Sequence, residues 1–250
     1  MNPAMRRDAL ALCMLVAAAG TAAAGCGDRP GPKLDWTGCS KTQLMLDGGD
    51  LAGGVFDKAS LTSTNFAKAK LAGARFVGAD VSFARFNDAD LAGADLGKAI
   101  GWRTQLPGAN LEGAKLVGAS LARANLAGAK LARADLAKSE LNRSDLSGAD
   151  LAGTDLSRSE LARVNFAKAS LKGAKLAFSN LARAQFAGAD LGDADLGRAY
   201  LYLTQFGGAD LTRVKGLAQE QIDIACGTPE TKLPQGLTRP KSWPCARDDD

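Results

Sequence analysis

Residues 129–151 read AKLARADLAKSELNRSDLSGADL, and a leucine stands at every fifth position of this stretch. The same register extends in both directions, from Leu51 to Leu211. Of the 33 positions in this series, 24 are Leu and seven are Phe, with Val81 and Gly101 as the exceptions. The residue two places before each of them is Ala in 22 cases and otherwise Gly, Ser, Thr or Val. Residues 49–213 therefore form one uninterrupted array of five-residue modules.

A period of five fits neither common secondary structure. On an α-helix, leucines five residues apart would be offset by about 140° and would spread around the whole cylinder. On a flat strand they would alternate between the two faces. The chain must therefore turn within each module so that every leucine points toward one axis, with the small residue two places earlier also inward. The other three positions, which carry the charges, must point outward.

A second period, of twenty residues, gives the number of modules in one coil. Twenty residues are four modules, which predicts a four-sided coil in which like residues stack on like. At a strand spacing of ~4.8 Å, about eight coils would make a rod about 40 Å long. The interval separates the phenylalanines Phe66, Phe86, Phe166, Phe186 and Phe206, and the arginines Arg103, Arg123, Arg143, Arg163 and Arg183.

These modules resemble those of the pentapeptide-repeat family, and the resemblance covers about two thirds of the chain. It implies an all-β fold, a right-handed quadrilateral β-helix. In that family the central Leu or Phe and the small residue two places before it fill the interior of the coil.

The segments on either side of the array are expected to cap it, because the open ends of a solenoid would otherwise pair with other chains. Residues 26–48 are expected to form an N-terminal linker and entry coil, since Trp36 and Leu46 keep the five-residue register. Residues 214–250 are expected to form a C-terminal cap and tail. Leu217, Gln221, Ile222 and Ile224 predict a short helix in the cap that ends at Gly227, followed by a proline-rich loop.

The register is broken once, at Gly101, where a core side chain is missing. We expect Ile100 or Trp102 to fold over the gap. The alternative is that these residues form an aromatic contact point together with Tyr200 and Tyr202, which lie on the same face.

Residues 1–25 have the features of a bacterial export signal, with Arg6 and Arg7 followed by an apolar run that ends in small residues. Cleavage after Ala24 would release a secreted chain in which Cys26 could pair with Cys39. The residues before Cys26 also resemble a lipobox, although Ala23 stands where Leu is usual, and lipidation of Cys26 is the favoured interpretation. An uncleaved membrane anchor is the third. The expected location is the periplasm, or the outer membrane through the lipid.

The remaining cysteines suggest one disulfide. Cys226 and Cys245 flank a short C-terminal loop and are the expected pair in an oxidising compartment. Cys39 falls at an inward, small-residue position, which favours a buried side chain over a disulfide or a reactive thiol.

Nothing in the sequence indicates an enzyme, a cofactor or a metal site. The chain has no histidine, which excludes histidine acid–base catalysis and histidine metal ligands. Its carboxylates recur once per module, which is typical of solvated ladders. A convex rod also offers no cleft for paired carboxylates.

The sequence predicts a rigid envelope scaffold or an interaction module whose partner is a protein or an anionic polymer. The most specific hypothesis is a linear anion-binding stripe made of Arg103, Arg123, Arg143, Arg163 and Arg183. Glu140 and Glu160 are expected to offset part of its charge and to leave +3. The alternative for the stripe is a solvated face. A DNA-mimicking, gyrase-binding role of the quinolone-resistance type, implied by some family members, fits poorly with a net charge of +4 and an export signal, and no nucleic-acid partner is expected.

Overall fold

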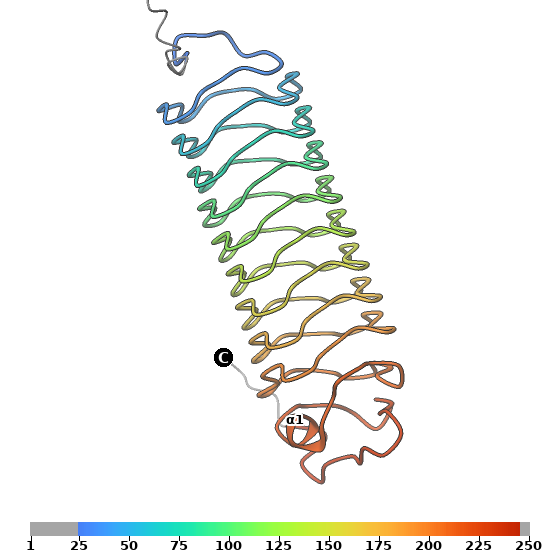
Figure 1. Ribbon diagram of the computed structural model, residues 1–250. Helices are drawn as coiled ribbons and strands as arrows, with labels where there is room; N and C mark the ends of the chain where they lie inside the picture. The colour runs from blue at the N-terminus through green and yellow to red at the C-terminus, as the bar shows by residue number, and fades with distance from the viewer. Residues whose placement is uncertain (1–24, 246–250) are drawn as a thin grey trace, which may run out of the picture.

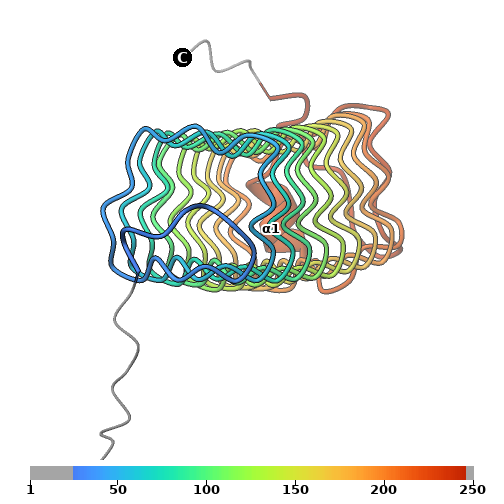
Figure 2. The same ribbon diagram turned by 90° about the horizontal axis from the view of Figure 1, so that it is seen from above.

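The computed structural model describes residues 25–245. It is a right-handed quadrilateral β-helix whose coils stack along one axis (Figure 1) and appear from above as a series of offset four-sided outlines (Figure 2). Each wall of a coil contributes one bridge residue, and successive bridges join residues twenty apart, from Asp35 with Val55 to Asp195 with Lys215. The four-module coil is therefore confirmed. The expected export signal lies, except for Gly25, outside the described residues.

The corners of the coils are uniform β-turns. Within each module the N–H of the small inward residue donates to the carbonyl of the preceding central residue, as from Gly54 to Leu51 at 3.0 Å. The residue two places after each centre has a left-handed backbone at every corner from Lys33 to Gly208, whether it is Gly, Lys, Arg, Ser, Gln, Phe, Asp or Leu. A hydrogen-bonded turn with positive φ only at its third residue is type II. The glycine recurrence thus marks a backbone requirement, because glycine adopts this conformation without strain.

The interior contains the side chains that the module predicts. Central residues such as Leu51, Leu136 and Phe206 are completely buried. Phenylalanines on successive coils stack face to face, with ring centroids 4.7 Å apart for Phe56 and Phe76 and 5.2 Å apart for Phe186 and Phe206. These distances are the rise of one coil, close to the usual spacing of neighbouring strands.

Serine and threonine are tolerated at the small inward position because their hydroxyl groups find a backbone acceptor. The Thr104 hydroxyl donates to the carbonyl of Val81 at 2.9 Å, and the Thr154 hydroxyl donates to that of Leu131 at 2.8 Å. Both acceptors are central residues of the preceding coil. The hydroxyls are therefore satisfied inside the core, where an unpaired polar group would be costly.

The gap at Gly101 is filled differently from the prediction. Ile100 and Trp102 are exposed, so neither folds over it. Instead Leu121 and Thr104 occupy the space, since a Cβ on Gly101 would lie 2.5 Å from Leu121 Cδ2 and 2.7 Å from Thr104 Oγ1. The missing side chain is thus replaced by Leu121 from the next coil and by Thr104, and the two apolar neighbours of Gly101 remain on the surface.

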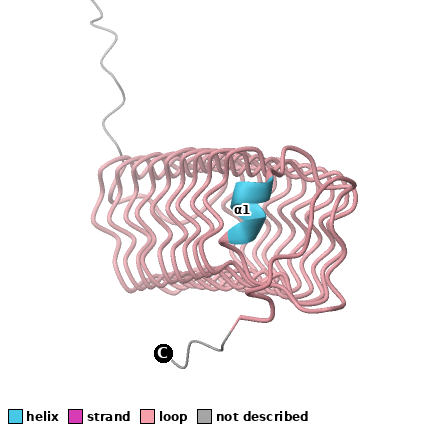
Figure 3. Ribbon diagram, turned by 90° about the horizontal axis from the view of Figure 1, so that it is seen from below, coloured by secondary structure: helices cyan, strands magenta, loops and turns pink. Residues whose placement is uncertain are grey.

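The C-terminal cap contains the helix α1, Gln219–Asp223, which lies across the end of the solenoid (Figure 3). Ile222 is buried, and the Gln221 amide donates to the carbonyls of Leu196 and Ala199 at 2.9 and 2.8 Å, which fastens the helix to the last coil. The helix ends before the predicted Gly227 because Cys226 returns to the ladder and bridges Gln205. No helical segment within residues 25–245 has the length and hydropathy of a membrane span.

Two disulfides hold the ends of the rod. Cys226 and Cys245 are joined, with their Cα atoms 5.5 Å apart, as the sequence suggested. Cys39 is buried at its inward position but is also joined to Cys26, with a Cα–Cα distance of 5.6 Å. This differs from the favoured expectation that Cys26 carries lipid, because a sulfur in a disulfide cannot also form a thioether. The entry segment is instead fastened to the first coil.

Candidate anion-binding surface

The predicted arginine stripe runs along one corner of the solenoid. Arg103, Arg123, Arg143, Arg163 and Arg183 each occupy the left-handed position of a turn, on five successive coils. The first four are exposed, whereas Arg183 is half-buried. Since successive coils are about 5 Å apart, neighbouring guanidinium groups repel by roughly 0.8 kcal/mol in water before screening.

The wall beside this corner brings further cations to the same surface. The other edge of that wall carries Lys98, Lys138, Arg158 and Arg198, which are all exposed corner residues. We define the cationic side as residues 98–103, 118–123, 138–143, 158–163, 178–183 and 198–203, whose sequences are KAIGWR, GASLAR, KSELNR, RSELAR, FSNLAR and RAYLYL. It contains nine cations and two carboxylates, so its net charge is +7. The whole chain carries +4, and the rest of the molecule is therefore net negative.

The two carboxylates of the cationic side form hydrogen bonds with neutral side chains of neighbouring coils. Glu140 accepts a hydrogen bond from the Ser120 hydroxyl at 3.0 Å, and Glu160 accepts one from the Asn180 amide at 2.8 Å. Both contacts run along the centre of the wall, from coil to coil. The glutamates thus lower the net charge of this wall while their oxygens are held by Ser120 and Asn180.

Most ion pairs of the described residues lie away from this surface. Arg75 pairs with Asp57 at 2.7 Å, Lys175 with Asp155 at 3.6 Å, and Arg133 with Glu112. On the cationic side, by contrast, no carboxylate among residues 25–245 comes within 4.0 Å of the charged groups of Arg103, Arg123, Arg143, Arg163, Lys98, Lys138, Arg158 and Arg198. These eight cations remain available to an external anion.

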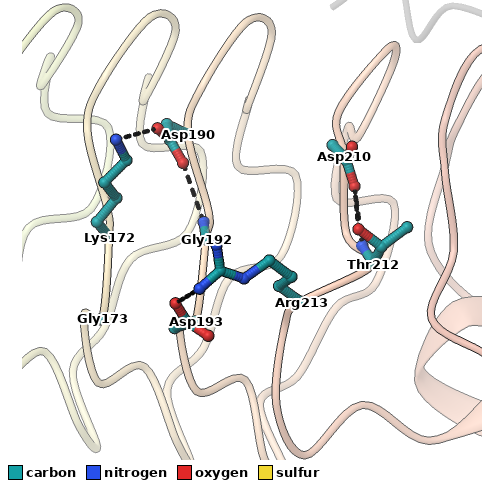
Figure 4. Close-up of a pocket in the computed structure, with 8 residues that line it drawn as sticks. All are labelled: Lys172, Gly173, Asp190, Gly192, Asp193, Asp210, Thr212 and Arg213. Atoms are coloured by element: carbon teal, nitrogen blue, oxygen red, sulfur yellow. Dashed lines mark hydrogen bonds and ion pairs between the residues drawn. The ribbon is translucent and has the colours of Figure 1, made fainter.

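A hollow on the opposite wall has a different character (Figure 4). It is lined by Lys172, Gly173, Asp190, Gly192, Asp193, Asp210, Thr212 and Arg213. No bridge joins Asp190 to Asp210 among the described residues, so the ladder opens between these coils. Gly173 and Gly192 have no side chains that would cover this part of the wall.

The charges in this hollow are already paired with neighbours. Asp190 accepts a hydrogen bond from the Gly192 N–H, which lowers the pKa of that carboxyl, and it pairs with Lys172 at 3.1 Å. The Thr212 hydroxyl and N–H donate to Asp210 and, together with Lys232 at 3.2 Å, lower the pKa of its carboxyl to about 2. Asp193 pairs with Arg213. The described residues contain no cluster of three or more side chains that could hold a metal ion, and we assign the hollow no ligand.

Sequence reasoning found the arginine column but missed the second cationic edge. The signal was present, because the spacings between these cations are multiples of twenty residues. The cations are Lys98, Lys138, Arg158 and Arg198. They are a mixture of Lys and Arg interrupted by Gly118 and Phe178, so no single residue type marks the column. The coil geometry is needed to show that this edge borders the same wall as the arginines.

Comparisons with known proteins agree with the fold. The family model for pentapeptide repeats matches in eight copies between residues 46 and 215. The crystal structure of HetL, a pentapeptide-repeat protein involved in heterocyst differentiation regulation from the cyanobacterium Nostoc sp. strain PCC 7120, is 31% identical with a TM-score of 0.62. The match covers 82% of this chain and 93% of the HetL chain. Full-length QnrB1, a plasmid-mediated fluoroquinolone resistance protein, is 18% identical with a TM-score of 0.58, over 78% of this chain and 94% of its own. No curated protein matches the sequence significantly.

Proposed function

Because the chain belongs to the pentapeptide-repeat family, we propose that it is an exported, non-enzymatic rod that binds an anionic polymer of the cell envelope along its cationic side. The observation that supports this proposal is the net charge of +7 on one wall. Neighbouring cations on successive coils are about 5 Å apart, which is shorter than the ~8 Å Debye length at physiological salt. They therefore act together on a polyanion, and the planar donor fork of arginine suits phosphate and carboxylate groups.

Non-enzymatic action is supported by the arrangement of ionisable groups. The carboxylates lie in columns on the outer walls, and those around the hollow, Asp190, Asp193 and Asp210, already have partners. A catalytic acid or base needs to be free to act on a substrate held against it, whereas the carboxylates of the hollow are held by Lys172, Arg213 and Thr212. Mimicry of duplex DNA would require a strongly acidic protein, whereas this chain carries a net charge of +4.

Export is supported by the two disulfides, which persist mainly outside the reducing cytoplasm. We propose that cleavage follows Ala24, so that the periplasmic chain begins at Gly25 and keeps Cys26 for its bond to Cys39. Mass spectrometry of the mature protein tests this. The expected result is an unmodified Gly25 terminus and a mass lowered by the hydrogens lost in two disulfides. A lipid on Cys26 as the first residue would contradict it.

The anion-binding assignment is tested with a soluble polymer. A variant with the five column arginines changed to Gln should bind a long linear polyphosphate at least tenfold more weakly than the parent, and the salt dependence of its affinity should be shallower, because fewer counterions are released. The control changes five exposed lysines on the other walls to Gln and should bind like the parent. Equal affinities for parent and arginine variant would refute the proposal. The control residues are Lys68, Lys70, Lys115, Lys130 and Lys168.

A further inference from the structure

Exposed apolar side chains gather on the cationic side. Within residues 25–245 the exposed large hydrophobic residues include Ile100, Trp102, Phe178, Tyr200 and Tyr202, and all five belong to this side. Phe83, one coil before Trp102 on the same corner, extends the group. Single exposed apolar residues are ordinary, but this set shares one wall with the excess positive charge.

The apolar residues form two clusters at the two ends of the wall. At the N-terminal end the rings of Phe83 and Trp102 meet edge to face with centroids 5.0 Å apart, and the Arg103 guanidinium lies 4.5 Å from the Trp102 ring centre. Ile100 is two residues before Trp102 in the same coil.

At the C-terminal end, Tyr200 and Tyr202 lie nearly parallel with ring centroids 6.2 Å apart. Phe178 lies one coil before them, with the guanidinium carbons of Arg158 and Arg198 at 5.3 and 5.6 Å from its ring centre. Five coil rises, about 24 Å, separate this cluster from the one at Trp102.

The shape of the wall also suits a planar array of anions. Its cations form two parallel columns at the two edges, one headed by Lys98 and the other by Arg103. A linear polymer lying along one edge would leave the other column unused, whereas a flat surface can contact both. In addition, Trp and Tyr are the residues that prefer the boundary between lipid headgroups and acyl chains.

We propose that the rod lies lengthwise on an anionic lipid bilayer, with the cationic side against the headgroup phosphates and the two aromatic clusters entering the interface at either end. This inference rests on the proposed function, since it uses the same wall and names lipid phosphate as the anion. Each basic residue held near an anionic leaflet adds a similar increment of attraction, and the aromatic clusters add a contribution that does not depend on salt.

The chain contains its own reporter for the experiment. It has three tryptophans, of which Trp36 and Trp243 are buried and Trp102 alone is exposed. On mixing with vesicles of phosphatidylcholine containing about one third phosphatidylglycerol, the Trp102 emission should shift to shorter wavelength and lose its quenching by aqueous acrylamide. Vesicles of phosphatidylcholine alone should produce neither change. A Trp102 that stays accessible to acrylamide while the protein sediments with vesicles would overturn the proposed orientation.

Variants separate this inference from the proposed function. Changing Trp102, Tyr200 and Tyr202 to Ser should weaken vesicle binding about tenfold and leave polyphosphate binding unchanged, while changing the same three residues to Phe should retain vesicle binding. Changing the five column arginines to Gln should reduce vesicle binding at least about 100-fold.

The remaining outcomes are also decisive. Binding of polyphosphate without binding of vesicles, or vesicle binding that is indifferent to the Ser variant, overturns the membrane inference but not the proposed function. Failure to bind either ligand overturns both. Tighter binding of a single-stranded oligonucleotide than of vesicles, with quenching of Trp102 by stacking, would replace the bilayer with nucleic acid.

Discussion

The left-handed corners make a quantitative prediction about stability. Lys138 has φ 61°, and its side chain lies on the surface. A left-handed backbone costs a residue with a Cβ roughly 1–2 kcal/mol. Glycine avoids that cost but loses about 0.5–1 kcal/mol more conformational entropy on folding. Lys138→Gly should therefore be about 0.5–1 kcal/mol more stable than Lys138→Ala, while Lys138→Ala should differ from the parent by less than about 0.5 kcal/mol.

The assay compares two variants that have lost the same charge, so only the backbone differs between them. Thermal or urea unfolding should place the glycine variant a few degrees above the alanine variant, since about 1 kcal/mol shifts Tm by about 2–4 °C in a chain of this length. The reverse control is Gly128→Ala, where a Cβ would meet no atom within 4 Å. The expected loss of about 0.5–1 kcal/mol therefore comes from the local backbone conformation and not from a clash with neighbouring residues. Equal midpoints for the two Lys138 variants would refute the reasoning.

Three further predictions concern the core and one surface carboxyl. Leu136→Asp should lower stability by more than about 3 kcal/mol because it buries an unpaired charge, and a melt like that of the parent would show that the inward assignment is wrong. Gly101→Ala should cost about 1–3 kcal/mol by overpacking against Leu121, measured by the same melts; a neutral result would mean that the neighbouring coil moves freely. The pKa of Asp210 is lowered to about 2, so its contribution to stability is complete above the usual carboxyl pKa and disappears as the pH falls toward 2. Thr212→Val should raise the Asp210 pKa in an NMR titration, and an unchanged value would exclude the hydroxyl as the cause.

The core and the coil could be predicted from the sequence because each inward position has a strict requirement. Every wall is one module long, so a residue such as Leu136 has only one way to point, and a twenty-residue stack repeats that requirement on each coil. Solenoids satisfy their packing with nearest neighbours alone. Predictions of a fold from its sequence usually fail at contacts between distant segments, and this fold contains none that must be known in advance.

The features that were missed depend on contacts between different coils. Nothing local to Gly101 indicates that Leu121, twenty residues later, fills its gap. The bond between Cys26 and Cys39 requires the entry segment to fold back on the first coil. The second cationic edge, headed by Lys98, joins the arginine wall only once the order of the four corners is known.

The twenty-residue coil constrains which insertions and deletions this chain can accept during evolution. Loss or duplication of twenty residues removes or adds one coil, and the surface columns on either side of the change stay aligned. Loss of five residues preserves the module and the buried leucines, yet it turns everything downstream by a quarter revolution. Arg163 and Arg183 would then stand on a different edge from Arg103 and Arg123, on a chain that still folds. Length variation in steps of five is therefore compatible with the architecture, but only steps of twenty preserve the surface.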